Sequence, residues 1–68
     1  MNVFGERLKE LRNAKGITQK ELAELLNVSG NTVHSWEKDK QEPSMSSLLF
    51  LSEYFEVSLD YLFGKSDY

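Results

Sequence analysis

Residues 18–38 read TQKELAELLNVSGNTVHSWEK, and their pattern is the strongest indication of the fold. The stretch opens with the pattern of a capping box. In this motif the Thr18 hydroxyl caps a helix, and the Glu21 side chain three positions later reaches back to the Thr18 backbone N–H. The apolar side chains that follow share one helical face, and they are Leu22, Ala23 and Leu26. The pattern predicts a short helix that starts at Thr18 and stops near Asn27.

A second short helix follows after a turn of about four residues, with Ser29 as its predicted N-cap. It runs roughly from Gly30 to Lys38, and Val33 and Trp36 lie on its inward side, three positions apart. Ala23 in the preceding helix is small enough to let the two helix backbones approach closely. We therefore expect the two helices to pack as one unit from which the second helix protrudes.

The outward face of this second helix consists almost entirely of short polar side chains: Asn31, Thr32, His34, Ser35 and Lys38. An ordinary solvated face is richer in Glu and Lys, which have better helix propensity. A helix whose exposed face carries residues of poor helix propensity often has a function on that face. A protruding helix about 10–12 Å across also matches the major groove of B-DNA, which is about 12 Å wide.

The apolar spacing is helical in the rest of the chain too, and no alternating run predicts a strand. Phe4, Leu8 and Leu11 form one stripe of a first helix. Three helices besides the central pair are predicted, over residues 3–15, 45–55 and 59–63. The 68 residues are thus expected to form a single all-α domain of five helices.

The composition excludes several classes of protein. The chain has no cysteine and one histidine, so we expect no disulfide, no thiolate nucleophile and no metal site. No nucleophile with its base and no glycine-rich phosphate loop is present, so no catalytic residue, cofactor or enzyme activity is predicted. No apolar run approaches the roughly 20 residues that span a bilayer, and the first residues contain no secretory apolar stretch. These features predict a cytoplasmic protein that does not enter a membrane.

The charge is distributed unevenly along the chain. The net charge is −3, yet residues 1–40 carry seven basic and six acidic side chains, a net of +1. Residues 41–68 carry one basic and five acidic side chains, a net of −4. Because neutralisation of phosphates dominates affinity for DNA, a DNA-binding face is expected in the first 40 residues, with the acidic part pointing away.

Several motifs in one order resemble those of the phage-repressor and Cro-like family of helix-turn-helix regulators, over nearly the whole chain. They are RLKELR at 7–12, GITQKELA at 16–23, Val28-Ser29, Trp36-Glu37, Pro43-Ser44 and VSLDYL at 57–62. The resemblance implies a lambda-repressor-like domain whose second helix-turn-helix helix enters the major groove. It also implies a transcriptional repressor that binds a palindromic operator in double-stranded DNA as a homodimer.

The resemblance also implies roles for individual side chains, each of which has a plain alternative as a solvated polar residue. Asn31 is the leading base reader, because an asparagine amide can bond adenine N6 and N7 together. The implied base-contacting positions are Gly30, Asn31, Thr32 and Ser35. The implied phosphate contacts, which position a protein without reading sequence, are Gln19, Ser29, His34, Lys38 and Lys40. Gly30 would only permit close approach to DNA.

Three further positions are interpreted by comparison with the family. Arg12 and Glu37 are expected to form a structural ion pair that holds the protruding helix against the first helix, and Arg12 could offer its remaining donors to a phosphate. Asn27 stands where the family commonly has glycine, and asparagine tolerates the left-handed conformation that such a turn requires.

An apolar patch towards the C-terminus is the candidate dimer surface, with Phe50, Leu59, Leu62, Phe63 and Tyr68 as its members. Phe50 is alternatively a single exposed apolar residue, which needs no explanation. The acidic C-terminal part and Phe50 leave open an antitoxin or adaptor of the same fold whose main partner is another protein. A further alternative is that the chain is the DNA-binding part of a longer regulator.

Overall fold

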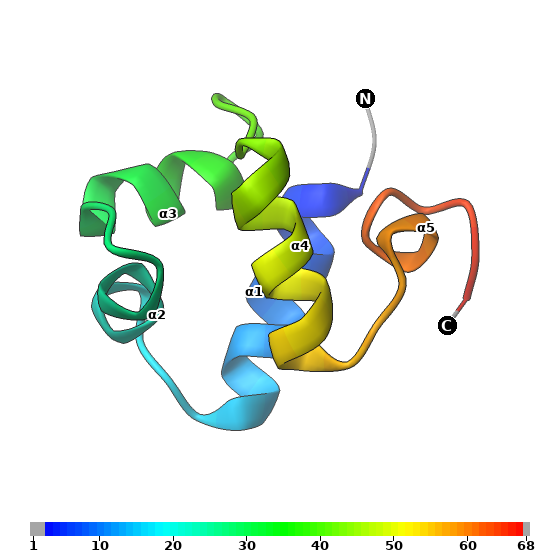
Figure 1. Cartoon of the computed structure of the whole chain (residues 1–68), viewed down its shortest axis with the longest axis horizontal. Helices are drawn as coiled ribbons and strands as arrows, with labels where there is room; N and C mark the ends of the chain where they lie inside the picture. The colour runs from blue at the N-terminus through cyan, green and yellow to red at the C-terminus, as the bar shows by residue number, and fades with distance from the viewer. Residues whose placement is uncertain (1–2, 68) are drawn as a thin grey trace.

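A computed structural model describes residues 3–67, which form five α-helices and no strand (Figure 1). The helices are α1 (Phe4–Lys15), α2 (Gln19–Leu26), α3 (Gly30–Glu37), α4 (Met45–Phe55) and α5 (Leu59–Leu62). In Figure 1, α2 and α3 lie together on the left, α5 lies on the right, and α1 and α4 run between them. The predicted all-α fold is confirmed, and each predicted helix end lies within one residue of the observed end.

The helix ends around the central turn follow from local side-chain hydrogen bonds. The Glu21 N–H donates to Thr18 Oγ1 at 3.0 Å, and the Thr18 N–H donates to Glu21 Oε1 at 2.8 Å, so the predicted capping box is present. Asn27 ends α2 in the left-handed conformation, with φ of 60°. Ser29 caps α3 by accepting the Thr32 N–H at 3.1 Å. The predicted caps of both central helices are confirmed.

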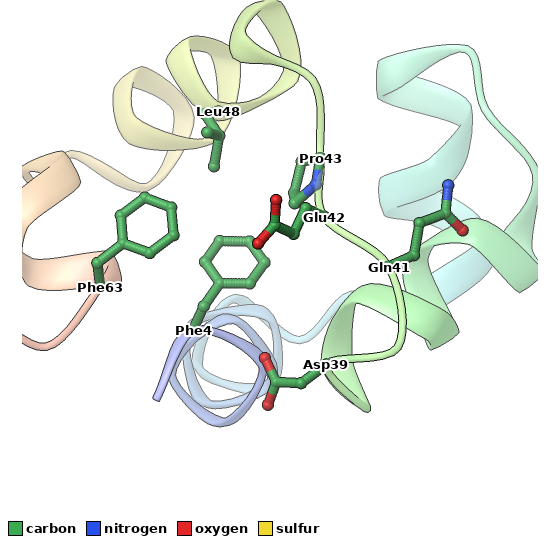
Figure 2. A pocket seen from close by; sticks show the side chains of 7 residues that line it. All are labelled: Phe4, Asp39, Gln41, Glu42, Pro43, Leu48 and Phe63. Atoms are coloured by element: carbon green, nitrogen blue, oxygen red, sulfur yellow. The ribbon is translucent and has the colours of Figure 1, made fainter. Parts of the chain in front are cut away.

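Side chains of α1 hold α5 and the segment after it in place. Arg7 Nη1 donates to the carbonyl oxygens of Tyr61, at 2.6 Å, and Ser66, at 2.8 Å. The same guanidinium lies 4.2 Å from the centre of the Tyr61 ring. The rings of Phe4 and Phe63 stack at 5.5 Å, and Figure 2 shows them facing the same hollow. An arginine and an aromatic pair thus help to attach the C-terminal helix to the N-terminal one.

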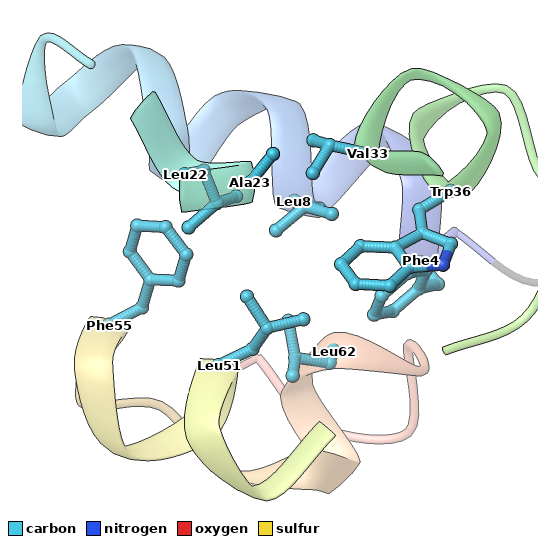
Figure 3. Packing of buried hydrophobic residues seen from close by; sticks show 9 residues of the cluster. All are labelled: Phe4, Leu8, Leu22, Ala23, Val33, Trp36, Leu51, Phe55 and Leu62. Atoms are coloured by element: carbon cyan, nitrogen blue, oxygen red, sulfur yellow. The ribbon is translucent and has the colours of Figure 1, made fainter. Parts of the chain in front are cut away.

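The core draws on all five helices (Figure 3). Burial of each large apolar side chain contributes about 1.5–3 kcal/mol to folding. Ala23 is 1% exposed, which fits the close approach of α2 and α3 that the sequence predicts. The buried cluster consists of Phe4, Leu8, Leu22, Ala23, Val33, Trp36, Leu51, Phe55 and Leu62. Within residues 3–67, no helix is long and apolar enough to cross a bilayer.

One sequence-based expectation about an apolar residue is wrong. The sequence places Leu62 in the surface patch, but its side chain is completely buried in the core, because α5 turns that side of its one turn inward. On α4, Leu49 is 49% exposed, and Met45 one turn earlier is 64% exposed. The outer side of α4 is therefore partly apolar.

The other members of the predicted patch lie near the surface. Phe50 is partly exposed, as expected, and its ring stacks on Tyr54 at 5.6 Å. Leu59 and Phe63 are half-buried and pack against the core cluster. Tyr68 lies outside the described residues.

Candidate nucleic-acid interface

The exposed side of α3 carries a continuous polar stripe. Asn31, His34 and Lys38 are exposed, and Ser35 is half-buried. Positions three and four apart on a helix are neighbours on one face, so these four side chains form a single surface, which we call the α3 stripe. The described structure therefore brings together four of the residues that the sequence assigns to DNA contacts.

Thr32 lies at the edge of the α3 stripe and has a local partner. Its Oγ1 is 2.9 Å from Ser29 Oγ, and its N–H donates to the same oxygen. Both hydroxyls therefore help to form the first turn of α3. Each keeps hydrogen-bonding capacity for a further partner, so the predicted DNA contacts of Ser29 and Thr32 stay predictions.

A shallow, open hollow separates the beginnings of α2 and α3. It is lined by Gln19, Lys20, Ser29, Gly30, Asn31 and His34. Helix N-termini favour anions, because their first N–H groups lack intrahelical partners and the helix dipole is positive there. Sequence reasoning alone misses Lys20, although its place in the first turn of α2 is a usable signal. A Cβ on Gly30 would lie 3.9 Å from the Lys20 Cα, so helix packing does not require glycine there.

An ion pair fixes α3 against α1. Arg12 Nε donates to Glu37 Oε2 at 2.7 Å and Arg12 Nη2 donates to Glu37 Oε1 at 3.2 Å. The two side chains are only 10% and 3% exposed, and such two-pronged contacts between arginine and carboxylate are among the strong hydrogen bonds of proteins. Arg12 Nη1 also donates to the carbonyl oxygen of Ile17 at 2.8 Å. The expected pair is thus present, and it also holds the connection between α1 and α2.

Gln19 gives Glu37 a second partner that the sequence does not reveal. Its amide nitrogen Nε2 donates to Glu37 Oε1 at 2.9 Å. One N–H of this amide is therefore engaged, and the other remains for a further acceptor such as a phosphate. Every side-chain nitrogen of Arg12 donates to a protein oxygen in a buried position. The suggestion that Arg12 also meets a phosphate finds no support in this geometry.

Lys38 and Lys40 place positive charge just beyond the last turn of α3. Both side chains are exposed, and Lys38 is the C-cap of the helix. The Lys40 N–H donates to the Ser35 carbonyl at 2.9 Å, which keeps its backbone close to the last turn. Within residues 3–67, no group of three acidic or histidine side chains is placed to hold a metal ion.

The same architecture is found in known proteins. The chain matches the family model described as Helix-turn-helix over residues 8–62. It belongs to this helix-turn-helix family.

Among similar proteins, the HTH-type transcriptional regulator ImmR of Bacillus subtilis is 48% identical over 64 residues. The HTH-type transcriptional activator BcrR of Enterococcus faecalis is 44% identical over 64 residues. Each match covers 94% of this chain, which spans 50% of ImmR and 31% of BcrR.

Solved structures agree with the family assignment. The P22 c2 repressor, solved in complex with a synthetic operator, superposes with a TM-score of 0.86 at 32% identity, covering 97% of this chain and all of that chain. A transcriptional regulator from Listeria innocua gives a TM-score of 0.88 at 34% identity, covering 94% of this chain and 60% of the other. The phage-repressor fold implied by the sequence motifs is therefore confirmed.

Proposed function

We propose that this domain binds double-stranded DNA sequence-specifically as part of a transcriptional regulator, with α3 in the major groove. The observation that carries the proposal is the α3 stripe, an exposed polar surface on a helix held rigidly by a buried ion pair. Membership of the helix-turn-helix family supports it. So does the likeness to the P22 c2 repressor, which was solved on operator DNA.

Base reading falls mainly to Asn31. Its side chain is exposed near the beginning of α3 and has no hydrogen bond with the rest of the described chain. A free asparagine amide can donate to and accept from one adenine edge at once, which discriminates against a wrong base by about 1–3 kcal/mol. Ser35 lies one turn further on, while Gly30 and Thr32 flank the stripe as the remaining base-contacting positions.

Contacts to the DNA backbone surround this reading surface. Lys38 and Lys40 provide charge at one end of α3. At the other end, Lys20 joins the positions assigned from the sequence, because it lines the hollow between the two helix N-termini. His34 and Ser29 also line this hollow, and Gln19 contributes the amide N–H that Glu37 does not use. These groups fix the position of α3 without reading sequence themselves.

The regulator acts as a homodimeric repressor on a palindromic operator in the cytoplasm. Dimer contacts come from the outer side of α4 and α5, where Phe50, Leu59 and Phe63 reach the surface and Leu62 does not. Met45 and Leu49 add exposed apolar area on α4. Two-fold symmetry of the protein then matches a palindrome, and we expect its half-sites one helical turn apart.

The test is to select binding sites from random duplex DNA with the wild-type protein and with Asn31→Ala. We expect the wild type to enrich a palindrome and the variant to lose base preference at one position in each half-site. Asn13→Ala changes an exposed asparagine near the end of α1 and serves as the matched control. If the wild type enriches no sequence and binds every duplex alike, specific recognition by α3 is wrong, and the search turns to a protein partner.

A further inference from the structure

Asp39 directly follows Lys38, the C-cap of α3, and adopts a conformation that usually selects glycine. Its φ is 58°, in the left-handed region that is costly for residues other than glycine, asparagine and aspartate. The Asp39 N–H donates to the Trp36 carbonyl at 3.1 Å, and the next N–H, of Lys40, reaches back to Ser35. This pair of hydrogen bonds is a Schellman motif, in which glycine commonly occupies the left-handed position. Aspartate tolerates this region at a residual cost relative to glycine, and a side-chain contact can compensate for that cost.

The compensating contact is made with the beginning of α1. Asp39 Oδ1 accepts the N–H of Gly5 at 3.1 Å, across 34 positions of sequence. This N–H belongs to the first turn of α1, where N–H groups have no partner within the helix. The residue preceding α1, Val3, provides no side-chain cap. Asp39 therefore caps α1 from a distant loop, and its charge faces the positive end of the helix dipole; Figure 2 shows its side chain directed from the end of α3 towards α1.

The location of this carboxylate is unfavourable for DNA binding on charge alone. Asp39 stands between Lys38 and Lys40 in the chain, and both lysines are exposed. A negative charge beside two phosphate-binding lysines weakens their attraction to DNA. The hydrogen bond to Gly5 nevertheless attaches the segment that carries the two lysines to α1. The hydrogen bond of Asp39 therefore favours DNA binding, whereas its negative charge opposes DNA binding. Experiment can separate the two effects.

We propose that Asp39 is a positioning residue for DNA binding: by accepting the Gly5 N–H, it fixes the segment that carries Lys38 and Lys40. This inference rests on the proposed function. Asp39 itself does not touch DNA. The held loop fixes the backbone from which both lysines extend, so that phosphate contacts and base contacts form in one register.

Two substitutions at position 39 separate geometry from charge. Asp39→Asn and Asp39→Gly both remove the negative charge, and both tolerate a positive φ. Only asparagine keeps an oxygen that can accept the Gly5 N–H. The measurement is the dissociation constant for a random-sequence duplex of about 20 base pairs, roughly the length that a helix-turn-helix dimer covers, as a function of NaCl concentration.

We expect Asp39→Asn to bind more tightly than the wild type, because a negative charge is removed and the loop stays fixed. Asp39→Gly should bind more weakly than Asp39→Asn. Its plot of log affinity against log salt should be shallower by about one for each phosphate that a lysine no longer neutralises. Exchange of the Gly5 amide hydrogen should be faster in Asp39→Gly than in Asp39→Asn. Equal affinities and equal slopes for the two variants overturn the assignment, because Asp39 would then act through charge alone.

Two controls keep the result specific. Glu56→Asn and Glu56→Gly form the matched pair, because Glu56 is also an exposed acidic residue, with φ of 57°, and these two variants should bind DNA alike. In a Lys38→Ala, Lys40→Ala background, the difference between Asp39→Asn and Asp39→Gly should disappear, because residues that act through one another are not additive. A difference that persists there means that Asp39 does not work through the lysines. If the wild type shows no salt-dependent binding to the duplex, the proposed function itself is wrong, which is a separate result.

Discussion

Gly5 lies against the backbone of Glu37 so closely that a β-carbon built on Gly5 would overlap the Glu37 carbonyl oxygen. The same β-carbon would stand 2.8 Å from the carbonyl oxygen of Trp36. Both oxygens belong to backbone, which cannot move aside as a flexible side chain can. Helix α1 thus crosses the end of α3 at a distance that only glycine permits.

Substitution Gly5→Ala should therefore destabilise the fold, although alanine is the better helix former by about 1 kcal/mol. We expect the free energy of unfolding in urea to fall by about 1–3 kcal/mol, the usual range for overpacking a tight contact. The matched control is Gly30→Ala in α3, where the new β-carbon meets only an ordinary contact at 3.9 Å. That variant should be neutral or slightly more stable, and an equal loss of stability in both would refute the steric explanation.

The buried pair between Arg12 and Glu37 predicts a large effect of removing the carboxylate charge. Glu37→Gln keeps the shape but leaves the Arg12 guanidinium, which is 8% exposed as a residue, without its counter-charge. Breaking one partner of a buried pair costs about 3–5 kcal/mol, so the denaturation midpoint should drop sharply. Glu24→Gln, at an exposed site on α2, should change stability by less than about 0.5 kcal/mol. Similar destabilisation in both variants would show that the pair contributes little.

Glu56 ends α4 in the left-handed conformation and is exposed. Glycine adopts this conformation without steric cost, so Glu56→Gly should stabilise the protein by about 0.5–1 kcal/mol. For a domain of this size, the expected rise in Tm by calorimetry is about 4 °C. Asn27→Gly, at φ of 60°, should give a smaller rise, because asparagine already tolerates this region. A lower Tm for Glu56→Gly would mean that the glutamate side chain contributes a contact in solution.

Arg7 holds the end of the chain through one nitrogen that serves two carbonyl oxygens, those of Tyr61 and Ser66. Arg7→Lys keeps the charge but removes the planar guanidinium, whose Nη1 donates to both oxygens and which lies over the Tyr61 ring. We expect amide hydrogens of residues 62–66 to exchange faster, while those of α2 and α3 keep their protection. Lys9→Ala, an exposed change in the same helix, is the control. Unchanged exchange in residues 62–66 would show that apolar packing alone holds α5.

Local patterns predict those features that depend on residues a few positions apart. The Thr18–Glu21 capping box and the Ser29 cap each involve a partner three residues away, and both follow correctly from the sequence. The polar face of α3 is also predictable, because the inward positions Val33 and Trp36 fix its orientation.

Features that depend on contacts between residues far apart in the sequence have no local pattern that predicts them. Asp39 and Gly5 are 34 positions apart, and nothing in either local sequence indicates that a loop residue caps the first helix. The sequence identifies Gln19 as a polar residue facing outward, but its bond to Glu37 depends on how α2 and α3 cross. The surface position predicted for Leu62 is wrong because a helix of four residues is too short for its apolar spacing to define an inward side.

Trp36 is the chain's single tryptophan, and it sits in α3 with 2% of its surface exposed. Among the described residues, its indole nitrogen has no hydrogen-bond acceptor. An indole in such dry surroundings emits fluorescence at shorter wavelength than one in water. The protein therefore carries an intrinsic optical probe on the hidden side of the helix that we propose enters the groove. Detachment of α3 from the core will appear as a red shift of its emission, without any added dye.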